Sequence, residues 1–195
     1  MRTYKGIEIE NADKKVSMAH SRFLERDEGI DWLVELLGME KAGLTPGQFE
    51  AMSALSSVGN MNYQICNGGL DQYYFNGYHR ERAPFNADDV KQLDKDAQVE
   101  MLRELLAFGR AVFPERELDN ERLDRIIADF DGSYYEEVEE VWYDDDGCED
   151  GGYYEEEGGL CAPWGFDNRY YEVNDYLEAL IEAYAQYLIK SYRAD

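Results

Sequence analysis

Residues 129–168 contain fifteen Asp and Glu side chains and no Lys, Arg or His, and this acidic segment restricts the fold more than any other feature of the chain. Two carboxylates about 7 Å apart in water repel by roughly 0.6 kcal/mol, which salt reduces to a few tenths. A dozen such pairs cost on the order of 3 kcal/mol, against about 5–15 kcal/mol for the stability of a whole domain. A rigid acidic cluster is therefore a sizeable burden, which a disordered tail would avoid by extending.

The aromatic residues of the acidic segment argue against simple disorder, because solvating tails contain few rings. Eight lie between residues 134 and 166: Tyr134, Tyr135, Trp142, Tyr143, Tyr153, Tyr154, Trp164 and Phe166. We expect them to pack beneath the chain and to leave the carboxylates facing outward. In "YYEEVEEVWY", the spacing of Tyr134, Val138, Val141 and Trp142 is helical, and glutamates would cover the other faces.

Helical periodicity dominates the rest of the chain. Apolar residues recur at every third or fourth position in three stretches, which predicts amphipathic helices at residues 30–37, 96–113 and 120–130. Pro114 is expected to stop the second of these helices. The most regular pattern runs from residue 175 to 190, where Asp175 and Glu178 are expected to form the N-terminal cap.

Another helix has a clear start signal after residue 44. Thr45 is a candidate N-cap, Pro46 suits the first helical position, and Gln48 completes a capping box. By contrast, residues 4–10, "YKGIEIE", alternate between apolar and polar side chains, which predicts a short strand.

These patterns predict one mainly α-helical domain, residues 1–195, with the acidic segment between its last two helices. Apolar residues make up 44% of the chain and aromatic residues 14%, so a core can form. Cys66, Cys148 and Cys161 have no metal-ligand spacing and no even disulfide framework. Without a signal peptide or a long apolar run, the sequence indicates a soluble, cytoplasmic protein.

The stretch "NGGLDQYYFN", residues 67–76, predicts a corner between two helical runs. Gly68 and Gly69 can adopt the left-handed conformations that end one helix and redirect the chain. Leu70, Tyr73 and Tyr74 would then share one helical face, and three polar residues of the same stretch would form hydrogen bonds to helix ends. These polar residues are Asp71, Gln72 and Asn76.

The same stretch resembles the NGG-x-x-Q-Y-x-x-N signature of the DMP19-like family of bacterial DNA mimics, and "FDNRYYEVNDYLEALIEAYAQYLIK" is similar to the C-terminal segment of that family. The likeness covers residues 49–113 and 166–190. It implies an all-helical fold that is often dimeric, in which acidic surface residues stand in for DNA phosphates. The motif itself indicates scaffold, so no partner-binding residue is carried over through it. The acidic segment departs from the family pattern.

Charge and resemblance together predict an acidic DNA mimic that binds and blocks the DNA-binding surface of another protein. Duplex DNA carries one negative charge per about 1.7 Å of axis, so fifteen carboxylates match roughly 25 Å, or about seven base pairs. The expected partner is a basic DNA-binding protein: a transcription regulator, a nucleoid protein, or a restriction or CRISPR-type nuclease of a host defence. The same potential would repel nucleic acid and anionic membranes, so neither is expected as a direct partner.

We predict twelve partner-binding residues, all within the acidic segment. The first eight are Asp144, Asp145, Asp146, Glu149, Asp150, Glu155, Glu156 and Glu157, and the next four are Glu136, Glu137, Glu139 and Glu140.

An alternative hypothesis is a divalent-metal-binding or purely structural acidic module. Residues 146–157, "DGCEDGGYYEEE", match a calcium loop at positions one, five, six and twelve, but Cys148 occupies position three, where an oxygen ligand is expected. A solvated loop that only keeps the protein soluble is a further alternative.

Enzyme chemistry is not predicted, and no catalytic residue, metal site or cofactor is assigned. The two histidines are His20 and His79, and His79 is expected at the surface. No nucleophile elbow, phosphate loop or zinc spacing is present. Cys66 lies in an apolar helical context that favours a small core residue over a reactive thiol. A tyrosine-rich face near the C-terminus is expected in the core or at a dimer seam: Tyr176, Tyr184, Tyr187 and Tyr192.

Overall fold

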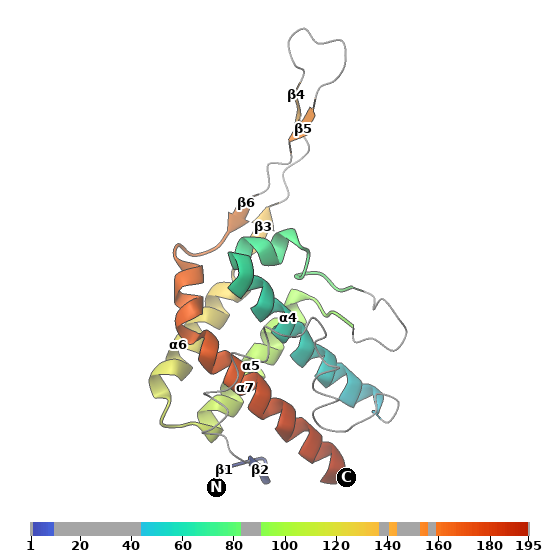
Figure 1. Ribbon diagram of the computed structural model, residues 1–195, viewed down its shortest axis with the longest axis vertical. Coiled ribbons are helices and arrows are strands. Elements are labelled where there is room, and N and C mark those ends of the chain that lie inside the picture. The colour runs from blue at the N-terminus through green and yellow to red at the C-terminus, as the bar shows by residue number, and fades with distance from the viewer. Residues whose placement is uncertain are drawn as a thin grey trace.

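The computed structural model describes residues 2–9, 44–82, 91–136, 141–143, 153–155 and 159–194, and this part of the chain is mainly helical, as predicted. The helix expected at residues 30–37 lies outside it. The helices of the described part are α4 (Pro46–Phe75), α5 (Lys95–Val112), α6 (Glu117–Asp131) and α7 (Phe166–Ala194). Helix α5 contacts the other three helices, and α7 also contacts α4 and α6, so the four form a bundle (Figure 1).

Helices α4 and α5 begin where local sequence signals place them, and α5 also ends at such a signal. The Thr45 side chain accepts a hydrogen bond from the Gln48 amide at 3.4 Å, and the Thr45 amide donates to Gln48 Oε1 at 2.9 Å. This confirms the predicted capping box. Helix α5 starts after Asp94, whose carboxylate accepts from the Ala97 amide at 3.0 Å, and it ends just before Pro114.

The predicted start of the last helix is wrong. Helix α7 begins at Phe166, so Asp175 and Glu178 lie in its interior, and the Glu178 side chain is only 4% exposed. The spacing of an acidic capping pair also occurs inside ordinary helices, and the actual start follows Gly165, whose φ is +73°.

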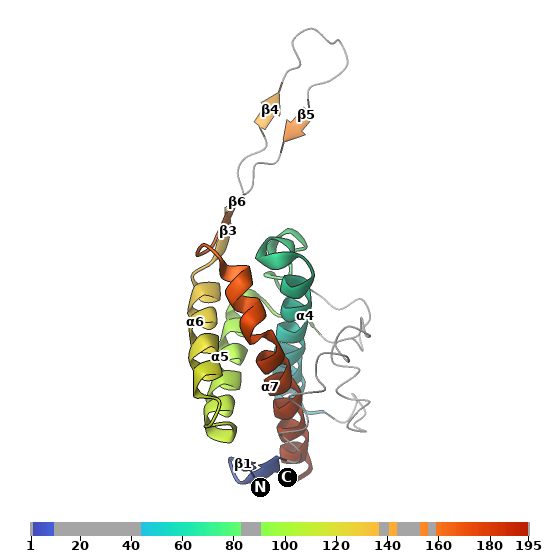
Figure 2. The ribbon, with the colours of Figure 1, turned by 60° about the vertical axis from the view of Figure 1, so that its left-hand side comes forward.

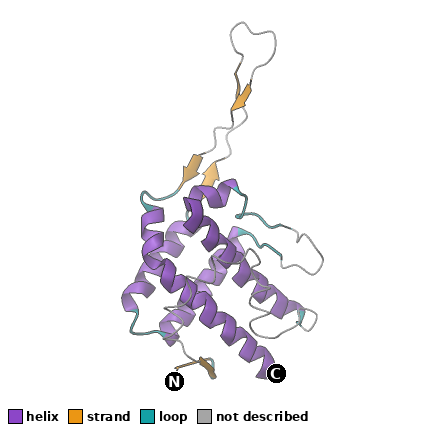
Figure 3. Ribbon diagram, viewed as in Figure 1, coloured by secondary structure: helices purple, strands orange, loops and turns teal. Residues whose placement is uncertain are grey.

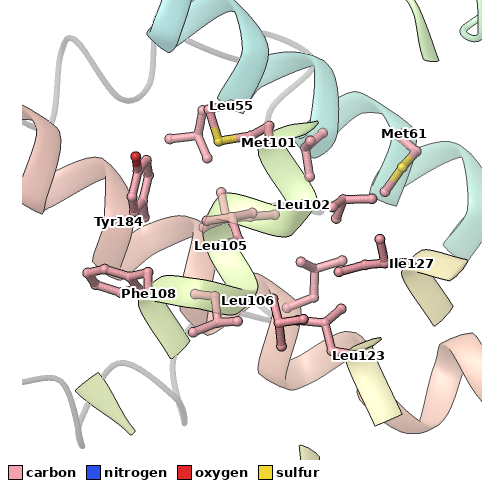
Figure 4. Close-up of a cluster of buried hydrophobic side chains, with 14 of the residues drawn as sticks. Leu55, Met61, Met101, Leu102, Leu105, Leu106, Phe108, Leu123, Ile127 and Tyr184 are labelled. Atoms are coloured by element: carbon pink, nitrogen blue, oxygen red, sulfur yellow. The ribbon is translucent and has the colours of Figure 1, made fainter. Parts of the chain in front are cut away.

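The core lies around α5, as Figure 4 shows. Leucines and a phenylalanine of α5 meet side chains of the three neighbouring helices there: Leu55 and Met61 of α4, Leu123 and Ile127 of α6, and Tyr184 of α7. The tyrosine-rich face of α7 belongs to this core, because Tyr176 and Tyr187 are buried and Tyr192 packs against it. Burial raises the pKa of the Tyr176 and Tyr184 hydroxyls.

The N-terminal segment is a hairpin of β1 (Arg2–Tyr4) and β2 (Ile7–Ile9), not the single strand predicted over residues 4–10. Lys5 and Gly6 both have positive φ, +46° and +84°, which is the geometry of a tight two-residue hairpin turn. Arg2 fixes the hairpin to the bundle, because its guanidinium donates to the Val112 carbonyl at the end of α5 at 2.9 Å.

Four short strands follow α6 and project from the opposite end of the bundle (Figures 1 and 3). Strand β3 (Tyr134–Glu136) pairs antiparallel with β6 (Gly159–Cys161), and β4 (Val141–Tyr143) pairs antiparallel with β5 (Tyr153–Glu155). We call residues 134–161 the acidic arm. The helical interpretation of "YYEEVEEVWY" is therefore wrong for 134–136 and 141–143. A helix would place Glu136 one turn from Glu139 and Glu140, and such like-charge neighbours destabilise it.

Candidate partner-binding surface

The corner predicted at residues 67–69 is present and interrupts α4. Gly69 has the predicted positive φ, +81° with ψ −179°, whereas Gly68 does not, because its φ is −155° and its ψ 21°; the helix stops and restarts at this pair. The Leu70 amide, which the interruption leaves without an intrahelical partner, donates to Asp167 Oδ1 of α7 at 3.0 Å. Leu70, Tyr73 and Tyr74 are all buried, as their shared face predicts. The corner therefore joins the end of α4 to the start of α7.

Polar side chains brace the corner through Gln64, a residue without a distinctive sequence signal. Its Oε1 accepts hydrogen bonds from the Gln72 side chain at 3.0 Å and from the Asn76 side chain at 2.8 Å. The Asn76 amide also donates to the Gln72 carbonyl at 2.9 Å. The side chains of Gln72 and Asn76 therefore bond to a side chain within α4 and not to helix ends as predicted, and Asp71 is exposed.

His79 lies beside the corner and is half-buried, so its expected surface position is wrong. Its ring centroid is 5.0 Å from that of Tyr74, and its Nε2 accepts a hydrogen bond from Arg80 at 3.0 Å. Burial lowers the pKa of the imidazole, and Arg80, Arg82 and Lys95 lower it further. We therefore expect a neutral packing residue here.

The base of the acidic arm is attached to this corner by Tyr74. Its hydroxyl donates to the Ser133 carbonyl at 2.9 Å and lies 2.8 Å from Ser133 Oγ, and its ring stacks on Tyr135 with centroids 6.2 Å apart. Lys95 Nζ donates to the Asp131 carbonyl at 2.9 Å and also to the Ser133 carbonyl. Tyr74 and Lys95 together fix the chain where it leaves α6 and enters β3.

The β3–β6 pair has one face on the bundle and one face in solvent. Tyr135 and Leu160 are register partners, and both pack against the core. On the neighbouring positions of β3, Tyr134 is 56% exposed and Glu136 is also exposed. The alternation of a strand explains why one tyrosine faces inward and the adjacent one outward.

The expectation that the rings of the acidic segment pack beneath it is only partly correct for the four rings whose side chains the structure describes, and the side chains of Trp142, Tyr143, Tyr153 and Tyr154 lie outside the described part. Phe166 is 3% exposed and Tyr135 is half-buried, but Tyr134 is exposed and Trp164 is 95% exposed. Helical periodicity could not identify these outward rings, because Tyr134 lies in a strand and Trp164 lies in a turn.

The structure describes two of the twelve predicted partner-binding residues. Glu136 is exposed on β3, and the backbone of Glu155 pairs with Val141 in the β4–β5 ladder. This second ladder lies beyond the β3–β6 pair and away from the helices in two views (Figures 1 and 2). Ten residues lie outside the described part of the chain: Glu137, Glu139, Glu140, Asp144, Asp145, Asp146, Glu149, Asp150, Glu156 and Glu157.

Three of the fifteen carboxylates of the acidic segment hold the base of the arm. Asp129 pairs with Arg169 at 2.8 Å, Asp131 pairs with Arg103 at 2.7 Å, and Asp167 accepts from the Leu70 amide. The remaining twelve are the predicted partner-binding residues, and no basic residue lies among them in the sequence. The helices show the opposite pattern, because their arginines pair with nearby carboxylates, as in Arg110–Asp124 at 2.7 Å.

The described residues provide little for metal or thiol chemistry. No group of three or more His, Cys, Asp or Glu within them is arranged to hold a metal ion. The calcium-like loop at 146–157 lies outside them except for residues 153–155. Cys66 packs against the core, and burial, assisted by Glu178 and Asp175, raises the pKa of its thiol to about 12. This agrees with the predicted packing role.

The described residues define a class of helical bundle with two short antiparallel ladders, β3–β6 and β4–β5, at one end. A family model described as "DMP19-like protein" matches residues 44–164, which is more than half of the chain, so the chain belongs to the DMP19-like family. The match includes the corner and most of the acidic segment, although we expected that segment to depart from the family, and residues 166–190 lie beyond it. No curated protein and no solved structure matches the chain. Within its described part, no helix is long and apolar enough to cross a membrane.

Replacing Tyr74 by Phe should loosen the arm at its base. The change removes the hydroxyl that bonds to Ser133 but keeps the ring that stacks on Tyr135. We expect a loss of about 1 kcal/mol of unfolding free energy, which lowers the melting temperature by about 2–4 °C. Thermal denaturation followed by circular dichroism would measure it. Tyr63→Phe, at a tyrosine that is 39% exposed on α4, is the control and should change nothing.

Proposed function

We propose that this protein is an acidic DNA mimic, which binds the DNA-binding surface of another protein and blocks it. The observation that carries the proposal is the separation of charge in the molecule. Twelve carboxylates and no basic residue occupy positions 136–157, while the helices of the bundle pair their arginines locally. Membership of the DMP19-like family supports the same function, because the resemblance implies that acidic residues replace DNA phosphates.

The size of the arm suits a single DNA-reading module. Twelve charges correspond to roughly 20 Å of duplex, or about six base pairs, at one charge per 1.7 Å. The described ladders β3–β6 and β4–β5 are antiparallel, with paired chains about 5 Å apart, and Glu136 of β3 and Glu155 of β5 lie on different strands of them. A groove lined with arginine and lysine would therefore meet a dense row of negative charge.

The expected partner is a basic DNA-binding protein, such as a transcription regulator, a nucleoid protein, or a restriction or CRISPR-type nuclease. Binding would release the counterions that the two charged surfaces hold when they are apart. Affinity should therefore fall steeply as salt is raised, and association should be fast at low salt.

Capture from a bacterial lysate tests the proposal. Immobilised protein should retain basic DNA-binding proteins at 0.1 M salt and release them as the salt concentration rises. Recovery of neutral partners alone, or release that is independent of salt, would contradict DNA mimicry.

Calorimetry with calcium tests the alternative hypothesis of a metal-binding module. Micromolar binding of calcium to the arm, together with capture of no DNA-binding protein, would favour that alternative.

A further inference from the structure

Among the residues that the structure describes, the three aromatic side chains with the greatest exposure lie at the end of the bundle that carries the acidic arm. Trp164 is 95% exposed, Phe75 80% and Tyr134 56%. Trp164 lies between β6 and α7, Phe75 is the last residue of α4, and Tyr134 begins β3, and these elements meet at one end of the molecule in both views (Figures 1 and 2). Single apolar residues on a surface are ordinary, but exposed rings gathered at one end indicate a binding surface.

The backbone of the turn that carries Trp164 is ordered, and the Trp164 side chain itself is almost fully exposed. Its carbonyl accepts a hydrogen bond from Arg169 Nη1 at 2.7 Å, and Nη2 of the same guanidinium pairs with Asp129 at 2.8 Å. The Phe166 amide donates to the Pro163 carbonyl at 3.1 Å, which closes the turn around Trp164. Because the backbone of the turn is already ordered, binding through Trp164 has to order only its side chain, and aromatic residues dominate many protein interfaces.

A hollow of about 260 Å³ lies beside this turn. Its apolar wall includes Leu70, Leu160 and Pro163, and its polar wall includes Asp167 and Asn168. The volume is below the range of ordinary small-molecule sites, which is about 300–1,000 Å³, so it suits one side chain better than a cofactor. The Asp167 carboxylate accepts from the Leu70 amide, and an ionised carboxylate has capacity for further donors.

The charge around the hollow favours a cation. The Asp167 carboxylate lines the hollow, and no Lys or Arg is among the described residues that line it. The one cation at the turn, Arg169, is already paired with Asp129. A long basic side chain could lay its apolar stem along Leu70 and Leu160 and place its charged head near Asp167.

We propose that this hollow receives an arginine side chain of the DNA-binding partner, with the Trp164 ring stacked against the guanidinium. The inference rests on the proposed function and specifies how the partner is recognised. Arginine fits better than lysine, because its planar guanidinium stacks on an aromatic face and donates to a carboxylate at the same time. The arm would then supply attraction by charge, and the hollow at its base would select a surface that presents arginine.

Two labelled peptides of equal charge, nona-arginine and nona-lysine, test the inference by fluorescence anisotropy. Trp164→Ala should weaken binding of nona-arginine about tenfold and binding of nona-lysine by less than about threefold. Leu118→Ala removes a 58% exposed apolar side chain near the start of α6 and should affect neither peptide. Equal binding of nona-arginine to native and Trp164→Ala protein would overturn the inference, and so would an equal loss for both peptides.

A variant of the arm separates this inference from the proposed function. It changes Asp144, Asp145 and Asp146 to Asn and Glu155, Glu156 and Glu157 to Gln. If the arm variant no longer binds either peptide while Trp164→Ala still binds both, the hollow has no role and DNA mimicry stands. If the arm variant still binds both peptides while Trp164→Ala no longer binds nona-arginine, the hollow binds arginine and DNA mimicry fails. In solution NMR, nona-arginine should shift the Trp164 indole N–H signal, and an unmoved signal would contradict the inference.

Discussion

Gly69→Ala should destabilise the protein by about 3 kcal/mol and lower its melting temperature by about 6–12 °C. Gly69 has φ +81° and ψ −179°, a conformation that only glycine adopts without strain. A Cβ at this position would also lie 2.6 Å from Asp167 Oδ2. Relief of that clash would push the Asp167 carboxylate away from the Leu70 amide, which donates a hydrogen bond to it at 3.0 Å. The restarted part of α4 would then lose this hydrogen bond to α7.

Gly47→Ala is the matched control for this substitution. Gly47 lies in the first turn of α4, where no atom lies within 4 Å of an added Cβ, and its φ is ordinary. Because alanine favours helix over glycine, we expect this variant to be stabilised by up to about 1 kcal/mol. Chemical denaturation of both variants measures the difference, and equal stabilities would show that the corner does not depend on Gly69.

Neutralising half of the charge of the arm should weaken partner binding about a hundredfold. The variant carries the six changes at residues 144–146 and 155–157. Each exposed ion pair contributes about 0.5 kcal/mol, and 1.4 kcal/mol corresponds to a tenfold change in affinity, so six pairs account for about two orders of magnitude. The slope of affinity against salt concentration should also become shallower, because fewer counterions are released. Binding titrations at several salt concentrations, with a partner recovered by capture, measure both effects.

A control variant loses the same amount of charge from the rest of the molecule. It replaces six exposed carboxylates outside the acidic segment by their amides: Glu8, Glu50, Asp71, Asp96, Glu100 and Glu117. If binding depended only on the net charge of the protein, both variants would bind equally weakly. If the arm is the binding surface, the control variant should lose much less affinity. Both proteins should keep their melting temperature within a few degrees, since neither set holds the core together.

Local signals in the sequence predicted much of the bundle. The capping box at Thr45, the stop at Pro114 and the glycine corner at Gly68 and Gly69 depend on residues within a few positions of one another. The structure confirms all three. The family resemblance was also correct, because the family model matches residues 44–164.

Contacts between distant residues account for what the sequence did not predict. Asp167 bonds to Leu70, which is 97 positions away, and no periodic pattern near residue 167 reports this partner. Strand β3 pairs with β6 across more than twenty residues, so the local spacing of "YYEEVEEVWY" suggested a helix. For the same reason, the outward positions of Tyr134 and Trp164 appear only once the strand and the turn are in place.

Competition with DNA tests the central claim most directly. A labelled duplex is bound to a DNA-binding protein recovered by capture, and this protein is then added while fluorescence anisotropy is followed. If the acidic arm occupies the DNA site, the duplex is fully released, and the midpoint of release rises in proportion to the DNA concentration. A stable complex that contains the duplex, its binding protein and this protein together would contradict the account.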